Sequence, residues 1–169
     1  MVEMDLSKKI LKPEEVIALA RENDREVIWD VTNGYPEAYE PIIRELRNRK
    51  FDYIVCPVGS GEAFVGLYDG LKKNKIKATL VGVGVSSSPS FADKLSTPWT
   101  PYKSRIAKIL ESKHRLIKLS ELEVHKLFEK YKHRFRSEPS STVVWAALEK
   151  LNIGPDKKII LVNSGQGLS

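Results

Sequence analysis

The sequence predicts an α/β fold: a three-layer α/β/α sandwich around a mostly parallel, twisted sheet of about five strands. Short apolar runs of strand length alternate along the chain with segments in which apolar residues recur at helical spacing. Most of these runs lead into loops rich in glycine, serine, threonine or asparagine. Strands that alternate with helices form parallel sheets with helices on both faces, so the observations together favour the sandwich.

The individual elements follow from apolar spacing and from caps and turns. The expected strands are residues 26–31, 53–56, 78–85, 115–119 and 158–162, with the fourth at a sheet edge. Helices are expected at residues 13–21, 36–48, 62–73 and 102–111, after Ser120 and after Ser140. Ser120 and Glu123 form a capping-box pattern, and two prolines predict irregular structure in residues 91–101.

Length and composition indicate one globular unit. A chain of 169 residues with 41% hydrophobic residues can bury a sizeable core, so we expect a single domain over residues 1–169. The apolar runs are too short to span a membrane, and the N-terminus lacks the apolar stretch of a secretory signal. The only cysteine, Cys56, cannot form an intrachain disulfide, so a cytoplasmic location is expected. The histidines lack the spacing of metal ligands, and we expect no metal site.

The charge favours an anionic partner, because 28 basic residues outnumber 22 acidic ones and give a net charge of +6. The densest basic cluster, residues 130–136, is interpreted as a solvated helix face and loop. No helix-turn-helix, zinc or RNA-binding signature accompanies it, which argues against nucleic acid. On the charge alone, a phosphate ligand and an acidic partner both stay open.

Four loops follow expected strands and should meet at the carboxyl edge of the sheet, where open α/β sheets bind ligands. They are residues 32–35, 57–61, 86–90 and 163–167. Their small and polar residues expose backbone N–H groups and hydroxyls, although the same composition also makes ordinary turns. We expect a small-molecule pocket at this edge, with plain connections as the alternative.

The loop at residues 57–61 (PVGSG) is the most specific of the four, because a strand leads into it and a helix follows. Unpaired N–H groups and the helix dipole at such a point favour an anion, typically a phosphate. The loop is neither a P-loop nor a dinucleotide fingerprint, because GK[ST] is absent and Phe64 stands where the third glycine belongs. A tight turn with close helix packing is the alternative interpretation.

Four motifs stand along the chain in one characteristic order. The first is the run 55–61 with Gly66 and the helix end 70–72, and the second is the strand segment 81–83. The third is residues 137–141 with 146–148, and the fourth is residues 162–168. In this order they resemble the fold-type II pyridoxal-phosphate enzymes, among them threonine synthase, cysteine synthase and tryptophan synthase β. The resemblance covers residues 26–169 and implies the large domain of that family.

The resemblance implies roles for particular residues. Gly59, Ser60 and Gly61 would bind the phosphate of pyridoxal phosphate through backbone N–H groups. Ser164 would hydrogen-bond the pyridine nitrogen, and Glu138 would lie near the edge of the cofactor. Alternatively, Glu138 is only an acidic residue at a helix N-terminus, where the helix dipole favours a negative charge.

The sequence also departs from the family in two ways. The lysine that carries the cofactor lies, in the family, in an S-x-K-[DN]-R-type motif before the glycine loop, on a smaller domain. Residues 1–58 contain no such motif, and residues 112–115 resemble it only with the wrong spacing and on the wrong side. Glu62 is the second departure, because a carboxylate in the first helical turn can satisfy the free N–H groups itself and would repel a phosphate.

The resulting expectation is a relative of these enzymes that is non-catalytic or incomplete, without the lysine-bearing domain. It would bind a small anionic or amino-acid-like ligand at the carboxyl edge of the sheet, with pyridoxal phosphate a candidate. The alternative is half of a split enzyme whose lysine domain is another chain. A weaker alternative is a pseudoenzyme that acts through protein contacts. A homo-oligomer or a partner chain is expected to cover the surface that faces the missing domain.

Overall fold

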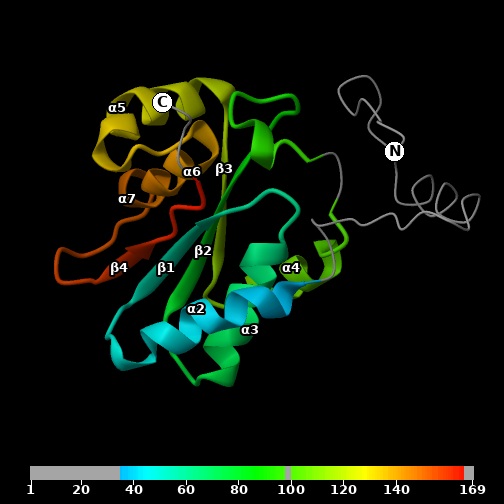
Figure 1. Cartoon of the computed structure of the whole chain (residues 1–169), viewed down its shortest axis with the longest axis vertical. Helices are drawn as coiled ribbons and strands as arrows, with labels where there is room; N and C mark the ends of the chain where they lie inside the picture. The colour runs from blue at the N-terminus through cyan, green and yellow to red at the C-terminus, as the bar shows by residue number, and fades with distance from the viewer. Residues whose placement is uncertain (1–34, 98–99, 166–169) are drawn as a thin grey trace, which may run out of the picture. The chain divides into compact units, whose positions relative to one another are not determined.

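A computed structural model describes residues 35–97 and 100–165 of the chain, and these residues belong to one compact unit, residues 32–169. Four parallel strands form its sheet in the order β3-β2-β1-β4 (Figure 1). Their bounds are β1 Tyr53–Pro57, β2 Thr79–Val85, β3 Arg115–Leu119 and β4 Ile159–Leu161. The parallel sheet and the edge position of β3 are as predicted, and the expected strand at 26–31 lies outside the described residues.

Helices cover both faces of this sheet, which confirms the predicted three-layer sandwich (Figure 1). One layer contains α2 (Glu40–Glu45), α3 (Glu62–Lys73) and α4 (Lys103–Leu110). The other contains α5 (Glu121–Phe135), α6 (Pro139–Thr142) and α7 (Ala146–Lys150). Consecutive side chains of β1 alternate between the layers: Ile54 and Cys56 pack on the α3 side, and Val55 packs on the α5 side.

Two expected helices are interrupted. The segment predicted as one helix over 36–48 consists of a 3-10 turn (Pro36–Tyr39), then α2, then a second 3-10 turn (Leu46–Asn48). Pro41 is the second residue of α2 and has no N–H to donate to the preceding turn, so a continuous helix cannot pass through it. The helix expected after Ser140 begins at Pro139, and a 3-10 turn (Val143–Trp145) separates α6 from α7.

The predicted capping box at the start of α5 is present. The Ser120 backbone N–H donates to Glu123 Oε2 at 2.7 Å, and the Ser120 hydroxyl donates to the same oxygen at 2.8 Å. Lys150 of α7 forms an ion pair with Glu123 Oε1 at 2.5 Å. The bond from Lys150, followed by those from Ser120, lowers the pKa of Glu123 to about 2. Glu123 therefore caps its own helix and also connects α5 to α7.

Helix α3 ends in a Schellman motif with a lysine at the left-handed position. The Ile76 N–H donates to the Leu71 carbonyl at 2.9 Å, and the Lys75 N–H donates to the Lys72 carbonyl at 3.1 Å. Lys75 has a φ of 54°, where glycine is the usual residue. The motif turns the chain sharply into β2, at a cost in backbone strain.

Replacing Lys75 by glycine is expected to raise the free energy of unfolding by about 1 kcal/mol, because glycine adopts the left-handed conformation without a clash of its own Cβ atom. Urea unfolding of the full chain measures the change. Lys77→Gly, at a residue with ordinary backbone angles, is the matched control and should lower stability. A loss of stability in both variants would contradict the strain at Lys75.

His114 connects β2 to the segment that leads into β3. Its Nδ1 accepts a hydrogen bond from the Leu80 N–H at 2.9 Å, and its ring packs edge-on against Tyr68 with centroids 5.2 Å apart. Burial, followed by the charges of Lys113 and Arg115, lowers the pKa of His114. Since Nδ1 is an acceptor, the neutral ring carries its proton on Nε2.

This lowered pKa predicts a loss of stability in mild acid. An unfolded histidine binds a proton near pH 6.5, while folded His114 resists protonation. The contribution of neutral His114 to the free energy of unfolding is complete above about pH 6.5. It is lost as the pH falls toward the lower pKa of the folded state. His114→Asn keeps an acceptor for the Leu80 N–H but does not titrate, so its unfolding free energy should vary less between about pH 7 and pH 5.

Chemical denaturation across that pH range tests the expectation. His133→Asn, at an exposed histidine, is the matched control and should follow the unmodified chain. Parallel curves for His114→Asn and the unmodified chain would contradict the assigned role of His114.

Other features bear on the sequence expectations. Cys56 is fully buried, and burial raises the pKa of its thiol to about 12, so it is a core residue rather than a nucleophile. Within residues 35–97 and 100–165, no group of three histidine, cysteine, aspartate or glutamate residues could hold a metal ion. None of the helices in the same ranges is long and apolar enough to cross a membrane.

Candidate functional site

The loop after β1 has the geometry expected for anion binding. Gly61 precedes α3 with a φ of 94°, which a residue with a Cβ atom rarely adopts. The backbone N–H groups of Gly59, Gly61 and Ala63 have no hydrogen-bond acceptor in the described part of the chain. The Thr100 hydroxyl donates to the Ser60 carbonyl and thereby holds the middle of the loop. Free donors at the start of a three-turn helix attract an anion.

Glu62 does not satisfy these N–H groups. Its side chain is buried, and its Oε1 accepts hydrogen bonds from the Tyr35 N–H at 2.5 Å and from the Tyr102 hydroxyl at 3.3 Å. The expectation that this carboxylate binds the N–H groups of its own helix is therefore wrong. The reason is long-range packing, since Tyr35 and Tyr102 supply the donors.

A cavity of about 310 Å³ opens beside the loop at the carboxyl ends of β1, β2 and β3. Gly59, Gly84 and Leu95 are among the residues that line it, and so are Lys103 and Lys118. Neither lysine has a carboxylate partner among the residues that the structure describes. Two unpaired ammonium groups next to free backbone N–H groups give this part of the sheet edge a positive potential.

Glu138 and Ser164 lie together in a second part of the same edge. Glu138 is the N-cap of α6, and its N–H donates to the Gly165 carbonyl at 3.4 Å. The Ser164 hydroxyl lies 3.0 Å from the hydroxyl of Ser141, which is buried in α6. The Glu138 carboxylate lies directly against Gly165, so a Cβ atom there would have to displace it. The structure therefore brings Glu138 and Ser164 together through neighbouring backbone, while their contacts with a cofactor stay a prediction.

Lys94 connects the two parts of the site. Its carbonyl oxygen would lie 2.7 Å from a Cβ atom at Gly59, so only glycine permits this approach. Its N–H donates to Ser140 Oγ at 3.2 Å, and its ammonium group is ion-paired with Glu138. The hydrogen bond to Glu138 raises the pKa of Lys94 and keeps it protonated.

The remaining loops contribute less than expected. In the loop 86–90, the Ser86 hydroxyl donates to the Leu119 carbonyl at 2.9 Å, and the Ser90 hydroxyl donates to Glu121 at 2.7 Å. Because these two hydroxyls are bonded within the protein, the loop 86–90 fits the alternative of a plain connection. The loop 32–35 and the end of the loop 163–167 lie largely outside the described residues.

Sequence reasoning missed Lys94, Lys103 and Lys118. Lys94 lies in a short 3-10 turn (Asp93–Leu95) inside the segment expected to be irregular. Its partner Glu138 is 44 residues away in the sequence. No local pattern distinguishes these three lysines from the solvated ones. The basic net charge was the only available signal.

Comparison with known proteins identifies the family of the chain. A family model described as "Pyridoxal-phosphate dependent enzyme" matches residues 6–165. The chain belongs to this family. No curated protein matches the sequence at a significant level. The family match confirms the resemblance that the four motifs indicated.

Solved structures of similar fold include several enzymes. The processed form of threonine deaminase isoform 2 from Solanum lycopersicum has a TM-score of 0.67 and 16% identity, covering 90% of this chain and 52% of its own. A fungal L-serine ammonia-lyase from Rhizomucor miehei has a TM-score of 0.68 and 15% identity, and the match covers 89% of this chain and 59% of the ammonia-lyase. The O-acetylserine-dependent cystathionine beta-synthase from Helicobacter pylori has a TM-score of 0.68 and 14% identity, and the match covers 94% of this chain and 57% of the synthase. The chain thus spans little more than half the length of these proteins, and at these identities the likeness shows the fold.

The described residues fit the phosphate of the family's cofactor. The unpaired N–H groups of Gly59 and Gly61 supply neutral donors, and Lys103 and Lys118 supply positive charge at the adjoining cavity. The buried Glu62 carboxylate is engaged by other donors. The chemistry of this donor set is that of a phosphate site.

Gly61→Ala is expected to lower the free energy of unfolding by about 2 kcal/mol or more, because a methyl group would combine left-handed strain with crowding. A Cβ atom there would lie 2.5 Å from Ile106 Cδ1. Ile106→Val removes that carbon, so the double variant should recover part of the loss in a denaturation cycle.

Gly154→Ala is the matched control, because Gly154 has no positive φ and a Cβ there would meet only the end of the Asp156 side chain. Its stability should change by no more than about 0.5 kcal/mol. A Gly61→Ala variant of unchanged stability would contradict the loop conformation described above.

Proposed function

We propose that this chain binds pyridoxal phosphate, or another small phosphate-bearing ligand, at the carboxyl edge of its sheet. The observation that supports this most directly is the loop 59–61, with free N–H groups at the start of α3 beside a cavity containing two unpaired lysines. A phosphate there would accept hydrogen bonds from the backbone and gain charge compensation from Lys103 and Lys118.

Ser164, Ser141 and Glu138 would orient the ring of the ligand. A hydroxyl group both donates and accepts, so Ser141 can donate to Ser164 Oγ and leave the Ser164 proton for a ring nitrogen. Glu138 would bound the ring on its α6 side, with its charge balanced by Lys94. When bound, pyridoxal phosphate supplies an electron sink for reactions at an amino-acid carbon.

We further propose that the described region does not complete a catalytic site by itself. The amine needed to hold the cofactor covalently must be unprotonated to react. Lys94 is joined to both parts of the site, but its ion pair with Glu138 keeps it protonated. We infer that Lys94 is a positioning residue rather than the amine.

A second candidate function is one part of an enzyme completed by another chain or segment. The chain spans only 52–59% of the threonine deaminase, ammonia-lyase and cystathionine beta-synthase structures. On this proposal, the remaining portion supplies the amine and the substrate contacts. A self-associated or hetero-oligomeric assembly would then bury the exposed face of this edge.

Four compounds test the proposal on the full chain: pyridoxal phosphate, pyridoxine phosphate, pyridoxine and inorganic phosphate. Pyridoxine phosphate has the ring and phosphate of the cofactor but no aldehyde, and pyridoxine lacks the phosphate as well. We expect pyridoxal phosphate and pyridoxine phosphate to raise the melting temperature equally, with inorganic phosphate competing and pyridoxine without effect. Binding to the folded state alone produces such a shift.

Variants test whether the phosphate binds at the cavity that Lys103 and Lys118 line. Lys103→Gln or Lys118→Gln should weaken binding by up to about fivefold, as expected for an exposed charge pair. Lys108→Gln, on the same helix as Lys103 but outside the cavity, should leave it unchanged. Equal effects of pyridoxine and its phosphate would contradict the phosphate site. A borohydride-trapped adduct of pyridoxal phosphate on one lysine would contradict the claim of incompleteness.

A further inference from the structure

A second cavity of about 320 Å³ lies at the opposite edge of the sheet. Its wall includes residues 77–78, which lead into β2, and residues 113–114, which lead into β3. The last turn of α3 and the Schellman turn complete it. In a parallel sheet this is the amino edge, so the cavity is separate from the loop 59–61.

Four lysines line this cavity: Lys72, Lys75, Lys77 and Lys113. No aspartate or glutamate lines it, and none of the four has a carboxylate partner in the ranges 35–97 and 100–165. Cations nearby are paired, since Lys73 binds Glu40 at 2.7 Å and Arg105 binds Asp69 at 2.6 Å. This cavity therefore gathers four uncompensated positive charges, against two at the cavity beside the loop 59–61.

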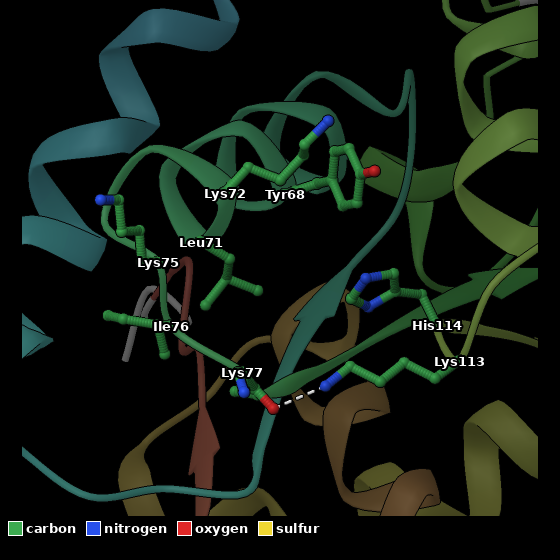
Figure 2. A pocket seen from close by; sticks show the side chains of 9 residues that line it. Tyr68, Leu71, Lys72, Lys75, Ile76, Lys77, Lys113 and His114 are labelled. Carbon is green, nitrogen blue, oxygen red and sulfur yellow. Dashed lines mark hydrogen bonds between the residues drawn. The ribbon is translucent and has the colours of Figure 1, made fainter.

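Two of the lysines are held by contacts that leave their charge available. Lys113 Nζ donates to the Lys77 carbonyl at 2.5 Å and crosses below His114 (Figure 2). An ammonium group has three protons, so two remain for a ligand. Lys72 Nζ lies 5.6 Å from the centroid of the Tyr68 ring. Lys113 thus provides a fixed donor at one side of the cavity, and Lys72 provides a charge beside an aromatic ring.

Apolar and aromatic side chains also line the cavity, and contacts with their neighbours hold them in place. The Schellman turn brings Ile76 back beside Leu71, and both side chains line the cavity. Tyr68 and His114 pack edge-on and line it as well. The bond from the Leu80 N–H fixes the His114 ring and leaves its proton on Nε2. The cavity therefore combines an apolar surface with several cationic donors.

We propose that this cavity is a second binding site, for a phosphomonoester whose body is a single apolar or aromatic ring. Lysines act as point charges and suit phosphate, whereas recognition of a carboxylate favours the paired donors of arginine, and no arginine lines the cavity. The volume is at the lower end of ligand pockets, which restricts the ligand to a small molecule. Helix α3 runs from the loop 59–61 to this cavity. The C-terminal end of a helix carries partial negative charge, so the positive potential here comes from the four lysines and not from the helix.

Phenyl phosphate is the probe that tests the site. Titrated into the ¹⁵N-labelled full chain, it should shift the amide resonances of residues 75–78 and of His114, with affinity that weakens as salt rises. Benzyl alcohol, which lacks the charge, should not shift them. Shifts at Gly59 and Gly61 report the other site separately, so failure of one site is distinguishable from failure of the other. Absence of shifts at residues 75–78 with millimolar phenyl phosphate would overturn the proposal.

Variants separate binding from folding. Lys75→Gly removes a charge while relieving the left-handed strain, so it should bind phenyl phosphate about three- to fivefold more weakly in a chain at least as stable. Lys77→Gln should weaken binding similarly, and Lys126→Gln, on the opposite layer, should not. Equal weakening by Lys126→Gln would indicate general charge attraction and overturn the site. Binding to anionic phospholipid vesicles without any response to phenyl phosphate would overturn it in favour of a membrane surface.

Discussion

The parallel pairing of β1 with β2 on one side and with β4 on the other determines the rest of this structure. Cys56 pairs with Gly82, and Val55 pairs with Leu161, so the three strands run in step. Because these strands are parallel, the loop 57–61 after β1 and the segment with Ser164 after β4 leave the sheet at the same edge. The two parts of the candidate site meet there as a consequence of strand direction.

Helix α3 connects the two edges of the sheet and has a left-handed residue beyond each end. Gly61 before it and Lys75 after it reverse the chain within a residue or two. At Gly61 the sequence uses the residue that adopts this conformation freely. At Lys75 it tolerates strain and places a charged side chain at the wall of a cavity. A strained residue retained at a cavity is the arrangement from which a functional role is inferred.

Much of the architecture was predictable because it depends on local patterns. The strand runs, the glycine loop and the capping box at Ser120 all act within a few residues. Those in the described part of the chain are present where expected, and the strand at 26–31 stays a prediction. The break in the segment 36–48 was predictable in principle from Pro41, whose missing N–H interrupts the hydrogen bonds of a continuous helix. The family motifs also placed the candidate site residues in segments that follow strands, and these segments lie at one edge of the sheet.

The parts that were missed depend on contacts distant in the sequence. Glu62 was expected to bind its own helix, but Tyr35 and Tyr102 engage its carboxylate instead. The pairing of Lys94 with Glu138 spans 44 residues. Local spacing contains no information on such pairs, because the fold brings them together only after the sheet has formed.

The ion pair between Lys94 and Glu138 also explains why a lysine at this edge need not be the catalytic amine. A carboxylate beside an ammonium group stabilises the protonated form and raises the lysine pKa. Covalent chemistry at a carbonyl needs the opposite, a lysine whose pKa is lowered by burial or by neighbouring cations. Lys94 has neither, since its side chain is exposed and its nearest charged partner is an acid. Its contacts to Gly59, Ser140 and Glu138 instead fix the distance between the loop 59–61 and α6. The same pair therefore joins the two parts of the candidate site and keeps its own amine protonated.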